Sequence, residues 1–175
     1  MRIPIESPTS YRGRNARPNW VTLGLFIGVA LGAGAIGFLF SPAHSPAAAK
    51  WYAGLAKPPW TAPSRWFGPV WMALYCLMGA AAWLVSRERY HERRSPALAA
   101  YFLQLVLNAA WAPLFFGGAN IGAGLFIMVA LWLALAWTVR AFAPVRAAAA
   151  WMLVPYLAWT TYALALNFSV WRLNP

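Results

Sequence analysis

Five long apolar runs dominate the 175-residue sequence and restrict its fold more than any other feature. They cover about residues 20–40, 66–85, 97–116, 121–139 and 147–170, and none contains Asp, Glu, Lys, Arg or His. A helix needs roughly 20 mostly apolar residues to cross the hydrocarbon core of a bilayer. Because lipid offers the backbone no hydrogen-bond partners, each run must satisfy its own peptide groups as a helix. The sequence therefore predicts an all-α fold, an integral membrane bundle of five transmembrane helices.

The segments outside these runs define the predicted domain organisation. Residues 1–19 are polar, basic and proline-containing, and we expect them to form a mobile tail. Residues 20–175 are expected to form one transmembrane domain, with a Trp- and Pro-rich loop at residues 41–65. The first run could instead be a cleaved signal peptide, but it is longer than the apolar core of such a peptide. We therefore keep it as the first helix.

The basic residues predict how the chain is oriented in the membrane. Ten of them precede the first helix or lie between the second and third or the fourth and fifth helices, and four lie on the other side. The positive-inside rule then places the N-terminus in the cytoplasm and the 41–65 loop on the opposite side. A net charge of +11 would also suit nucleic acid. Its position at the ends of apolar runs instead favours contact with anionic membrane lipid, and no nucleic-acid partner is predicted.

Ionisable residues are missing from the predicted membrane interior, and this excludes several functions. The sequence has no Asp; Glu6, Glu88 and Glu92 lie in the tail or a connector, and His44 and His91 lie in connectors. Ion-coupled transporters usually carry ionisable groups at membrane depth. Carboxylate acid–base catalysis within the bundle is excluded for the same reason, as is a buried histidine ligand to haem iron. No metal site and no obligatory cofactor are predicted.

Neutral amides are the polar groups that remain at depth. Gln104, Asn108 and Trp111 share one face of the third predicted helix, and Asn167 lies in the fifth. An unpaired amide in hydrocarbon costs several kcal/mol, so these side chains should point into the bundle. Two interpretations stay open, namely that the amides tie helices together or that they contact a ligand.

Large aromatic side chains accompany the amides. Trp71 and Tyr75 share a face of the second predicted helix, and Trp159 and Ala163 share a face of the fifth. Tryptophans near run ends fit the aromatic belt of the membrane interface. Four deeper ones do not: Trp71, Trp111, Trp132 and Trp159. Flat apolar walls with one or two amides suit a planar hydrophobic ligand.

Small residues on the first predicted helix raise the question of self-association. Gly24, Gly28 and Gly32 recur at four-residue spacing, a stripe that lets two helices approach closely. The stripe serves packing within one bundle and dimerisation equally well.

Three segments resemble the tryptophan-rich sensory protein family, whose mitochondrial relatives are called translocator protein or peripheral benzodiazepine receptor. They are WYAGLAKPPWTAPSRWFGPVW (51–71), QLVLNAAWAPLFFG (104–117) and VPYLAWTTYALALNF (154–168). The resemblance implies an often dimeric five-helix bundle with a pocket that opens toward the first loop. It also implies binding of porphyrins and haem, of sterols in animals, and of benzodiazepine-site drugs. Some bacterial members are reported to break down protoporphyrin in the light.

Positions that match the family imply a ligand site. Trp71 and Trp159 would be its pocket tryptophans, and Asn108 its ligand-facing amide. The resemblance also gives a small residue that tunes ligand fit, Ala163, and two residues of the covering loop, Tyr52 and Trp60. With the residues that share helix faces, the predicted ligand-binding set is Tyr52, Trp60, Trp71, Tyr75, Gln104, Asn108, Trp111, Trp159 and Ala163.

The C-terminal part of the fifth predicted helix departs from the sterol motif of animal members. Phe168 stands where that motif has tyrosine. Sterol binding is therefore not predicted.

The predicted function is a membrane receptor or sensor for porphyrin-type ligands, in tetrapyrrole or stress regulation. The 41–65 loop is expected to act as a lid, with Lys57 or Arg65 meeting ligand carboxylates. An alternative is a light-dependent porphyrin-degrading enzyme with Trp71 and Trp159 as redox partners. Two further alternatives are a facilitator of hydrophobic-ligand transport and a purely structural subunit. A homodimer is expected from the resemblance.

Overall fold

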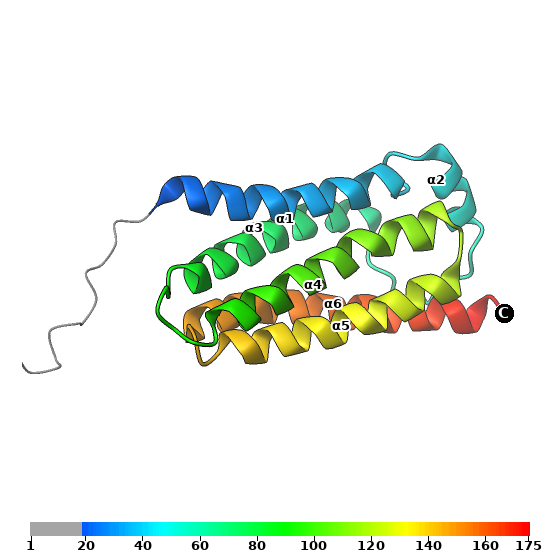
Figure 1. Ribbon diagram of the computed structural model, residues 1–175. Helices are drawn as coiled ribbons and strands as arrows, with labels where there is room; N and C mark the ends of the chain where they lie inside the picture. The colour runs from blue at the N-terminus through cyan, green and yellow to red at the C-terminus, as the bar shows by residue number, and fades with distance from the viewer. Residues whose placement is uncertain (1–18) are drawn as a thin grey trace, which may run out of the picture.

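The computed structural model describes residues 19–175, in which the regular secondary structure consists of helices joined by loops (Figure 1). The α-helices are α1 (Trp20–Phe40), α2 (Pro46–Ala53), α3 (Phe67–Ser86), α4 (Arg94–Ala112), α5 (Ile121–Phe142) and α6 (Ala147–Leu173). A 3-10 turn, η2 (Ser64–Trp66), precedes α3, and a π-helical turn, η3 (Pro113–Gly117), follows α4. All α-helices except α2 are long and apolar enough to span a membrane. The predicted five-span bundle is confirmed. Of the predicted basic tail, only Asn19 belongs to the described residues.

The loop predicted at residues 41–65 contains a short helix, α2, which the sequence analysis missed. Ser45 caps α2 by accepting a hydrogen bond from the Ala48 N–H at 3.3 Å, and Pro46 occupies the first helical position. Proline suits that position because its missing N–H would be unpaired there in any case. At the other end of α2, Lys57 Nζ donates to the carbonyl oxygens of Tyr52 and Leu55 at 2.6 and 2.7 Å. This part of the loop is therefore a capped helix.

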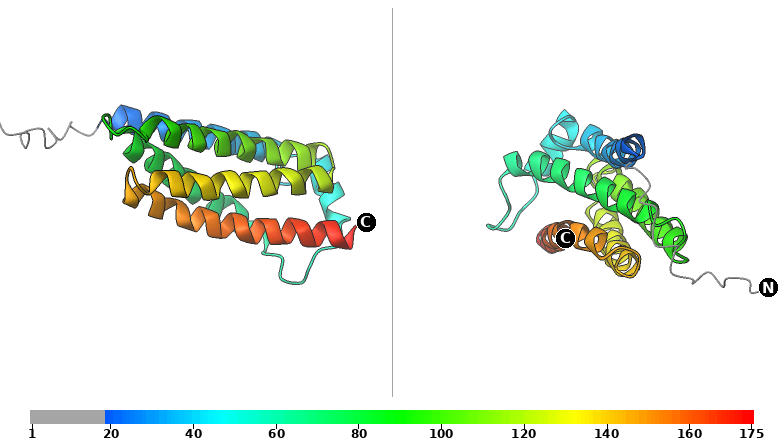
Figure 2. Two further views of the ribbon diagram at one scale, coloured as in Figure 1. Left: turned by 60° about the horizontal axis from the view of Figure 1, so that its bottom comes forward. Right: turned by 90° about the vertical axis from the view of Figure 1, so that its left-hand side faces the viewer.

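The five long helices form one bundle in which each has two or three neighbours. Helix α1 packs on α3 and α4, α3 also packs on α6, and α5 packs on α4 and α6. The view along the bundle in Figure 2 shows this arrangement. One end of the bundle holds the start of α1 and the α3–α4 and α5–α6 connectors (Figure 1); we call it the arginine-rich end. The other end holds α2 and the C-terminus, and we call it the α2 end.

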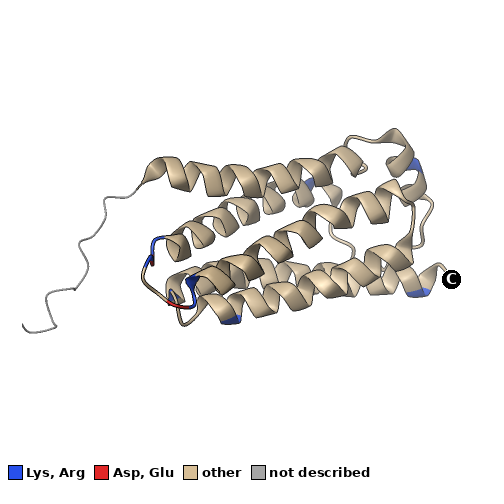
Figure 3. Cartoon of the chain, viewed as in Figure 1, with Lys and Arg blue, Asp and Glu red and all other residues tan. Residues whose placement is uncertain are grey.

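Charged residues lie only at these two ends within residues 19–175, as Figure 3 shows. Contrary to the sequence-based expectation, three arginines lie in the end turns of helices and not in connectors: Arg94, Arg140 and Arg172. Long arginine side chains can reach headgroups from a terminal helical turn. Arg140 and Arg172 also complement the negative C-terminal end of their helices. The structure does not show which end faces the cytoplasm, so the orientation stays a prediction.

Glycines define how α1 is seated. A Cβ added at Gly79 of α3 would lie 2.6 Å from the Cα of Ile27, so the backbones of α1 and α3 are in close contact there. At Gly24, Gly28 and Gly32 an added Cβ would meet no described atom within 4 Å. The stripe therefore faces away from the bundle and plays no part in its internal packing. The homodimer stays a prediction.

Pro155 lies well inside α6, not in its first turn. Proline in a helix interior removes one backbone hydrogen bond and favours a bend. The helix nevertheless continues to Leu173 and provides one side of the candidate site.

Candidate ligand-binding site

The carboxamide of Asn108 joins three helices at the centre of the bundle. Tyr75 Oη of α3 donates a hydrogen bond to Asn108 Oδ1 at 2.7 Å, and Asn108 Nδ2 donates to Tyr156 Oη of α6 at 2.6 Å. Trp71 extends this group, because its ring stacks on Tyr75 at 5.5 Å and meets Tyr156 edge-on at 6.0 Å. We call Trp71, Tyr75, Asn108 and Tyr156 the amide network. Both amide atoms of Asn108 have partners, so in this structure Asn108 ties helices together.

Gln104 lies one turn from Asn108, on the side of the arginine-rich end. Its side chain is fully buried; Nε2 lies 3.8 Å from Met78 Sδ, and Oε1 has no partner among the described residues. Gln104 does not line the cavity described next. The structure thus brings this predicted residue near the site but not into it.

A small cavity lies between the network and the α2 end. Its volume is about 40 Å³, and it is lined by Tyr52, Trp111, Phe115, Phe116, Ala163, Leu166, Asn167 and Val170. The turn η3 places both phenylalanines there, and the Gly118 N–H closes it by donating to the Pro113 carbonyl oxygen at 2.8 Å. Trp111 stacks on Phe115 with ring centroids 5.1 Å apart. Three predicted residues, Tyr52, Trp111 and Ala163, therefore meet at this cavity.

Asn167 provides the amide of the cavity wall, and the predicted ligand-binding set does not include it. The residue is 3% exposed, and neither Oδ1 nor Nδ2 has a hydrogen-bond partner within residues 19–175. The indole Nε1 of Trp111 is also buried and unpartnered. Leaving a buried polar group unpaired costs about 1–3 kcal/mol. The spacing of Asn167, four residues after Ala163 on one helix face, is the sequence signal that could have added it to the set.

The loop after α2 is fastened to α6. Tyr162 Oη accepts a hydrogen bond from the Ala62 N–H at 2.7 Å. The Asn174 carboxamide accepts from the Ala56 N–H and donates to its carbonyl oxygen, both at 3.0 Å. Trp60 rests edge-on against Tyr162 at 5.8 Å and is 47% exposed. The loop passes beside α6 in Figure 2.

Two of the deep tryptophans, Trp132 of α5 and Trp159 of α6, do not line the cavity. Trp159 packs edge-on against Phe67 at 5.6 Å and in a tilted arrangement against Tyr162 at 5.3 Å, and its buried Nε1 has no described partner. Trp132 Nε1 donates to Thr161 Oγ1 at 2.8 Å, which joins α5 to α6 away from the site. Apart from Gln104, the predicted residues therefore fall into three adjacent groups: the amide network, the cavity wall and the contacts around Tyr162.

The charged residues of the loop differ in their availability. Lys57 Nζ is engaged with the two carbonyl oxygens at the end of α2 and lies 4.7 Å above the Tyr52 ring. Arg65 is exposed and makes no hydrogen bond or ion pair with the part of the chain described here. Burial raises the pKa of Tyr52, and the nearby Tyr162 raises it further. Tyr52 therefore stays a neutral hydroxyl at the cavity.

Comparison with known proteins places this architecture among known membrane proteins. Residues 25–172 match the model of the TspO/MBR family. The chain is 42% identical over 127 residues to human translocator protein, covering 71% of this chain and 75% of that protein. It is 41% identical over 144 residues to Protein CrtK of Rhodobacter capsulatus, covering 82% and 86% of the two chains. It is 38% identical over 156 residues to Tryptophan-rich protein TspO of Chlorobaculum tepidum, covering 89% and 97%.

Proposed function

This chain belongs to the TspO/MBR family of integral membrane proteins, and from that premise we propose that it is a receptor for flat hydrophobic ligands of the porphyrin class, such as protoporphyrin or haem. The ligand would enter at the α2 end, between the loop, α4 and α6. The fraction of sites that hold ligand would then report the tetrapyrrole level, as a sensor in tetrapyrrole or stress regulation requires.

The observation that supports this most is the unpartnered Asn167 carboxamide in an aromatic wall. Ligand sites for drug-sized molecules are mostly apolar, with a few polar groups that fix orientation. The cavity wall has that composition, because its polar side-chain groups are one amide, one indole N–H and the Tyr52 hydroxyl, set among aromatic and aliphatic side chains. Both polar atoms of the Asn108 amide are paired. Among the described residues, Gln104 Oε1 is unpaired but does not face the cavity, whereas both polar atoms of Asn167 are unpaired in the cavity wall. The orphaned amide of Asn167 instead suits a partner from outside the chain.

A porphyrin requires more space than the cavity offers. About 40 Å³ holds about one water molecule, whereas sites for such ligands measure about 300–1,000 Å³. Binding therefore requires the rings of Tyr52, Phe115 and Phe116 to separate and the loop to move from α6. The loop is fastened there by polar contacts from Tyr162 and Asn174, which can be exchanged for water when the loop opens.

The carboxylates on the rim of a porphyrin would lie toward the α2 end. Lys57 is already engaged in capping α2. Arg65 is exposed and is the residue that we assign to these carboxylates, because guanidinium–carboxylate pairs are strong and directional.

Titration of the purified protein with protoporphyrin, while tryptophan fluorescence is followed, tests the proposal. We expect strong saturable quenching by protoporphyrin and by haem, because Trp71, Trp111 and Trp159 would lie close to the bound pigment. A sterol serves as the control, since it cannot quench by this route. Quenching that does not saturate, or that Asn167→Leu leaves unchanged, would count against a site at this position.

The alternative of light-dependent porphyrin breakdown stays a prediction and is tested in the same samples. Trp71 and Trp159 belong to α3 and α6, which pack on each other. If both indoles take part in the breakdown, illumination will bleach bound protoporphyrin, and Trp71→Phe combined with Trp159→Phe will slow the bleaching. Equal bleaching in both proteins would leave only binding.

A further inference from the structure

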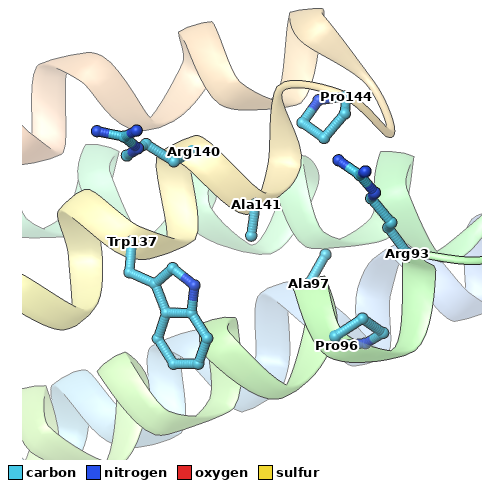
Figure 4. Close-up of a pocket in the computed structure, with 7 residues that line it drawn as sticks. All are labelled: Arg93, Pro96, Ala97, Trp137, Arg140, Ala141 and Pro144. Atoms are coloured by element: carbon cyan, nitrogen blue, oxygen red, sulfur yellow. The ribbon is translucent and has the colours of Figure 1, made fainter.

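A second hollow lies at the arginine-rich end, on the outer side of the α4–α5 pair. It has a volume of about 170 Å³ and is lined by Arg93, Pro96, Ala97, Trp137, Arg140, Ala141 and Pro144 (Figure 4). The first three belong to the start of α4 and its cap, and the others to the end of α5 and the following connector. The hollow is at the opposite end of the bundle from the candidate ligand site.

The hollow is positively charged and contains no carboxylate. Arg93 and Arg140 are exposed, and neither guanidinium makes an ion pair or hydrogen bond with residues 19–175. The carboxylate of Glu88 is engaged elsewhere, because it pairs with Arg146 at 3.3 Å. Glu92 is not among the lining residues. The N-cap of α4 and the last turn of α5 thus bring two uncompensated positive charges to one hollow, beside the positive N-terminal end of α4.

Trp137 gives the hollow an apolar side. It lies one helical turn before Arg140 on α5 and is 54% exposed. Tryptophan in such a position is typical of the boundary between hydrocarbon and headgroups. The hollow therefore crosses that boundary, with an indole on the hydrocarbon side and guanidinium groups on the headgroup side. A soluble anion would use only the second part, whereas a phospholipid would use both.

We propose that this hollow binds the phosphate of an anionic phospholipid from the adjoining leaflet. In Figure 4 the Arg140 guanidinium is directed away from Arg93, so its exposed side chain must turn toward the hollow for both residues to hold the phosphate oxygens. The planar guanidinium fork is well suited to that contact. The glycerol and the first acyl carbons lie against Trp137. This site is independent of the porphyrin proposal, since it shares no residue with the cavity at the α2 end.

Native mass spectrometry of the detergent-solubilised protein tests the assignment, with phosphatidylglycerol and phosphatidylcholine as probes. We expect tighter binding of phosphatidylglycerol. Each basic residue near an anionic lipid contributes a factor of about five, so Arg93→Gln combined with Arg140→Gln should lower its affinity roughly thirtyfold. The matched control is Arg89→Gln combined with Arg172→Gln, which removes the same charge from exposed arginines outside the hollow and should retain the preference.

A second measurement places the lipid in the protein. The protein is placed in nanodiscs that contain brominated phosphatidylglycerol. The difference in fluorescence between the wild type and Trp137→Phe gives the signal of Trp137, and we expect the bromine to quench this signal. The Arg93 and Arg140 variant should lose this quenching. Equal affinity for the two lipids, equal losses in the matched control, or full competition by inorganic phosphate would each overturn the proposal. The last result would assign the hollow to a soluble anion.

Discussion

Asn167→Leu is the substitution that best separates ligand binding from stability. The two side chains have the same number of non-hydrogen atoms, so the change removes hydrogen-bonding capacity with little change in shape. Asn167 is 3% exposed, and both of its polar amide atoms lack partners within residues 19–175. A buried amide without hydrogen bonds costs about 1–3 kcal/mol. The adjoining cavity has room for about one water molecule, which would satisfy part of the amide. We therefore expect the ligand-free variant to be more stable by about 1 kcal/mol, near the lower limit.

The same substitution should weaken porphyrin binding. A hydrogen bond to a neutral group contributes about 0.5–1.5 kcal/mol, and one to a charged group about 1.5–3 kcal/mol. The expected loss of affinity is thus about twofold to twelvefold for a neutral contact and larger if a ligand carboxylate reaches the amide. Stability is measured by thermal unfolding in detergent and affinity by tryptophan quenching with protoporphyrin.

Asn108→Leu is the matched control for that experiment. It breaks two interhelical hydrogen bonds and leaves the hydroxyl groups of Tyr75 and Tyr156 unpaired. Interhelical hydrogen bonds in membranes average about 0.6 kcal/mol each, so Asn108→Leu should destabilise the protein by at least about 1 kcal/mol. Asn167 is not a ligand-facing amide if Asn167→Leu destabilises the protein as much as Asn108→Leu does, or if the Asn167 variant binds porphyrin with unchanged affinity.

Three further predictions concern packing, the loop and pH. Gly79→Ala should destabilise the protein by about 1–3 kcal/mol in a detergent unfolding assay, because its Cβ would collide with the α1 backbone. The matched control is Gly28→Ala, whose added methyl group meets open space and should be neutral or slightly stabilising. An equal loss of stability in the two variants would show that α1 packs on α3 through another face. Tyr162→Phe combined with Asn174→Ala removes the hydrogen bonds that fasten the loop, and stopped-flow fluorescence should show faster protoporphyrin association and dissociation; unchanged rates would exclude the loop as a gate. Burial raises the pKa of Tyr52 above its ordinary value of 10.0, so the stability that its neutral form provides should be constant below pH 10.0 and be lost as the pH rises from there through the higher folded-state value. Limited proteolysis of the loop measures the docking of α2, and loss of docking at neutral pH would contradict this prediction.

The sequence predicts the membrane spans well because their signal is local. Twenty apolar residues without a charge can be satisfied in lipid only as a helix, whatever surrounds them. The limits are less predictable: α5 and α6 continue beyond the apolar runs to Phe142 and Leu173, since arginine in a last turn can extend to the headgroups. Helix α2 was missed because it is short and proline-flanked. Ser45 followed by Pro46 is nevertheless a recognisable helix start.

The candidate site shows what periodicity can and cannot give. Helix spacing correctly places Asn108 and Trp111 inside the bundle, and it favours Asn167 equally. It cannot tell which amide finds a partner, because that depends on tyrosines from other helices. Tyr75 and Tyr156 satisfy Asn108, while no described side chain reaches Asn167. The phenylalanines of the cavity wall depend on the π-helical turn after Pro113, which an ideal helical repeat does not represent.

One helix, α6, contributes to all three groups of the candidate site. Tyr156 belongs to the amide network, Asn167 to the cavity wall, and Tyr162, with the C-cap residue Asn174, fastens the loop. A substitution in α6 can therefore change ligand affinity, thermal stability and the rate of ligand entry at the same time. A change of ligand specificity made in α6 will therefore need compensating substitutions elsewhere. Helices α4 and α2 contribute to fewer of the three groups, so they tolerate such substitutions better.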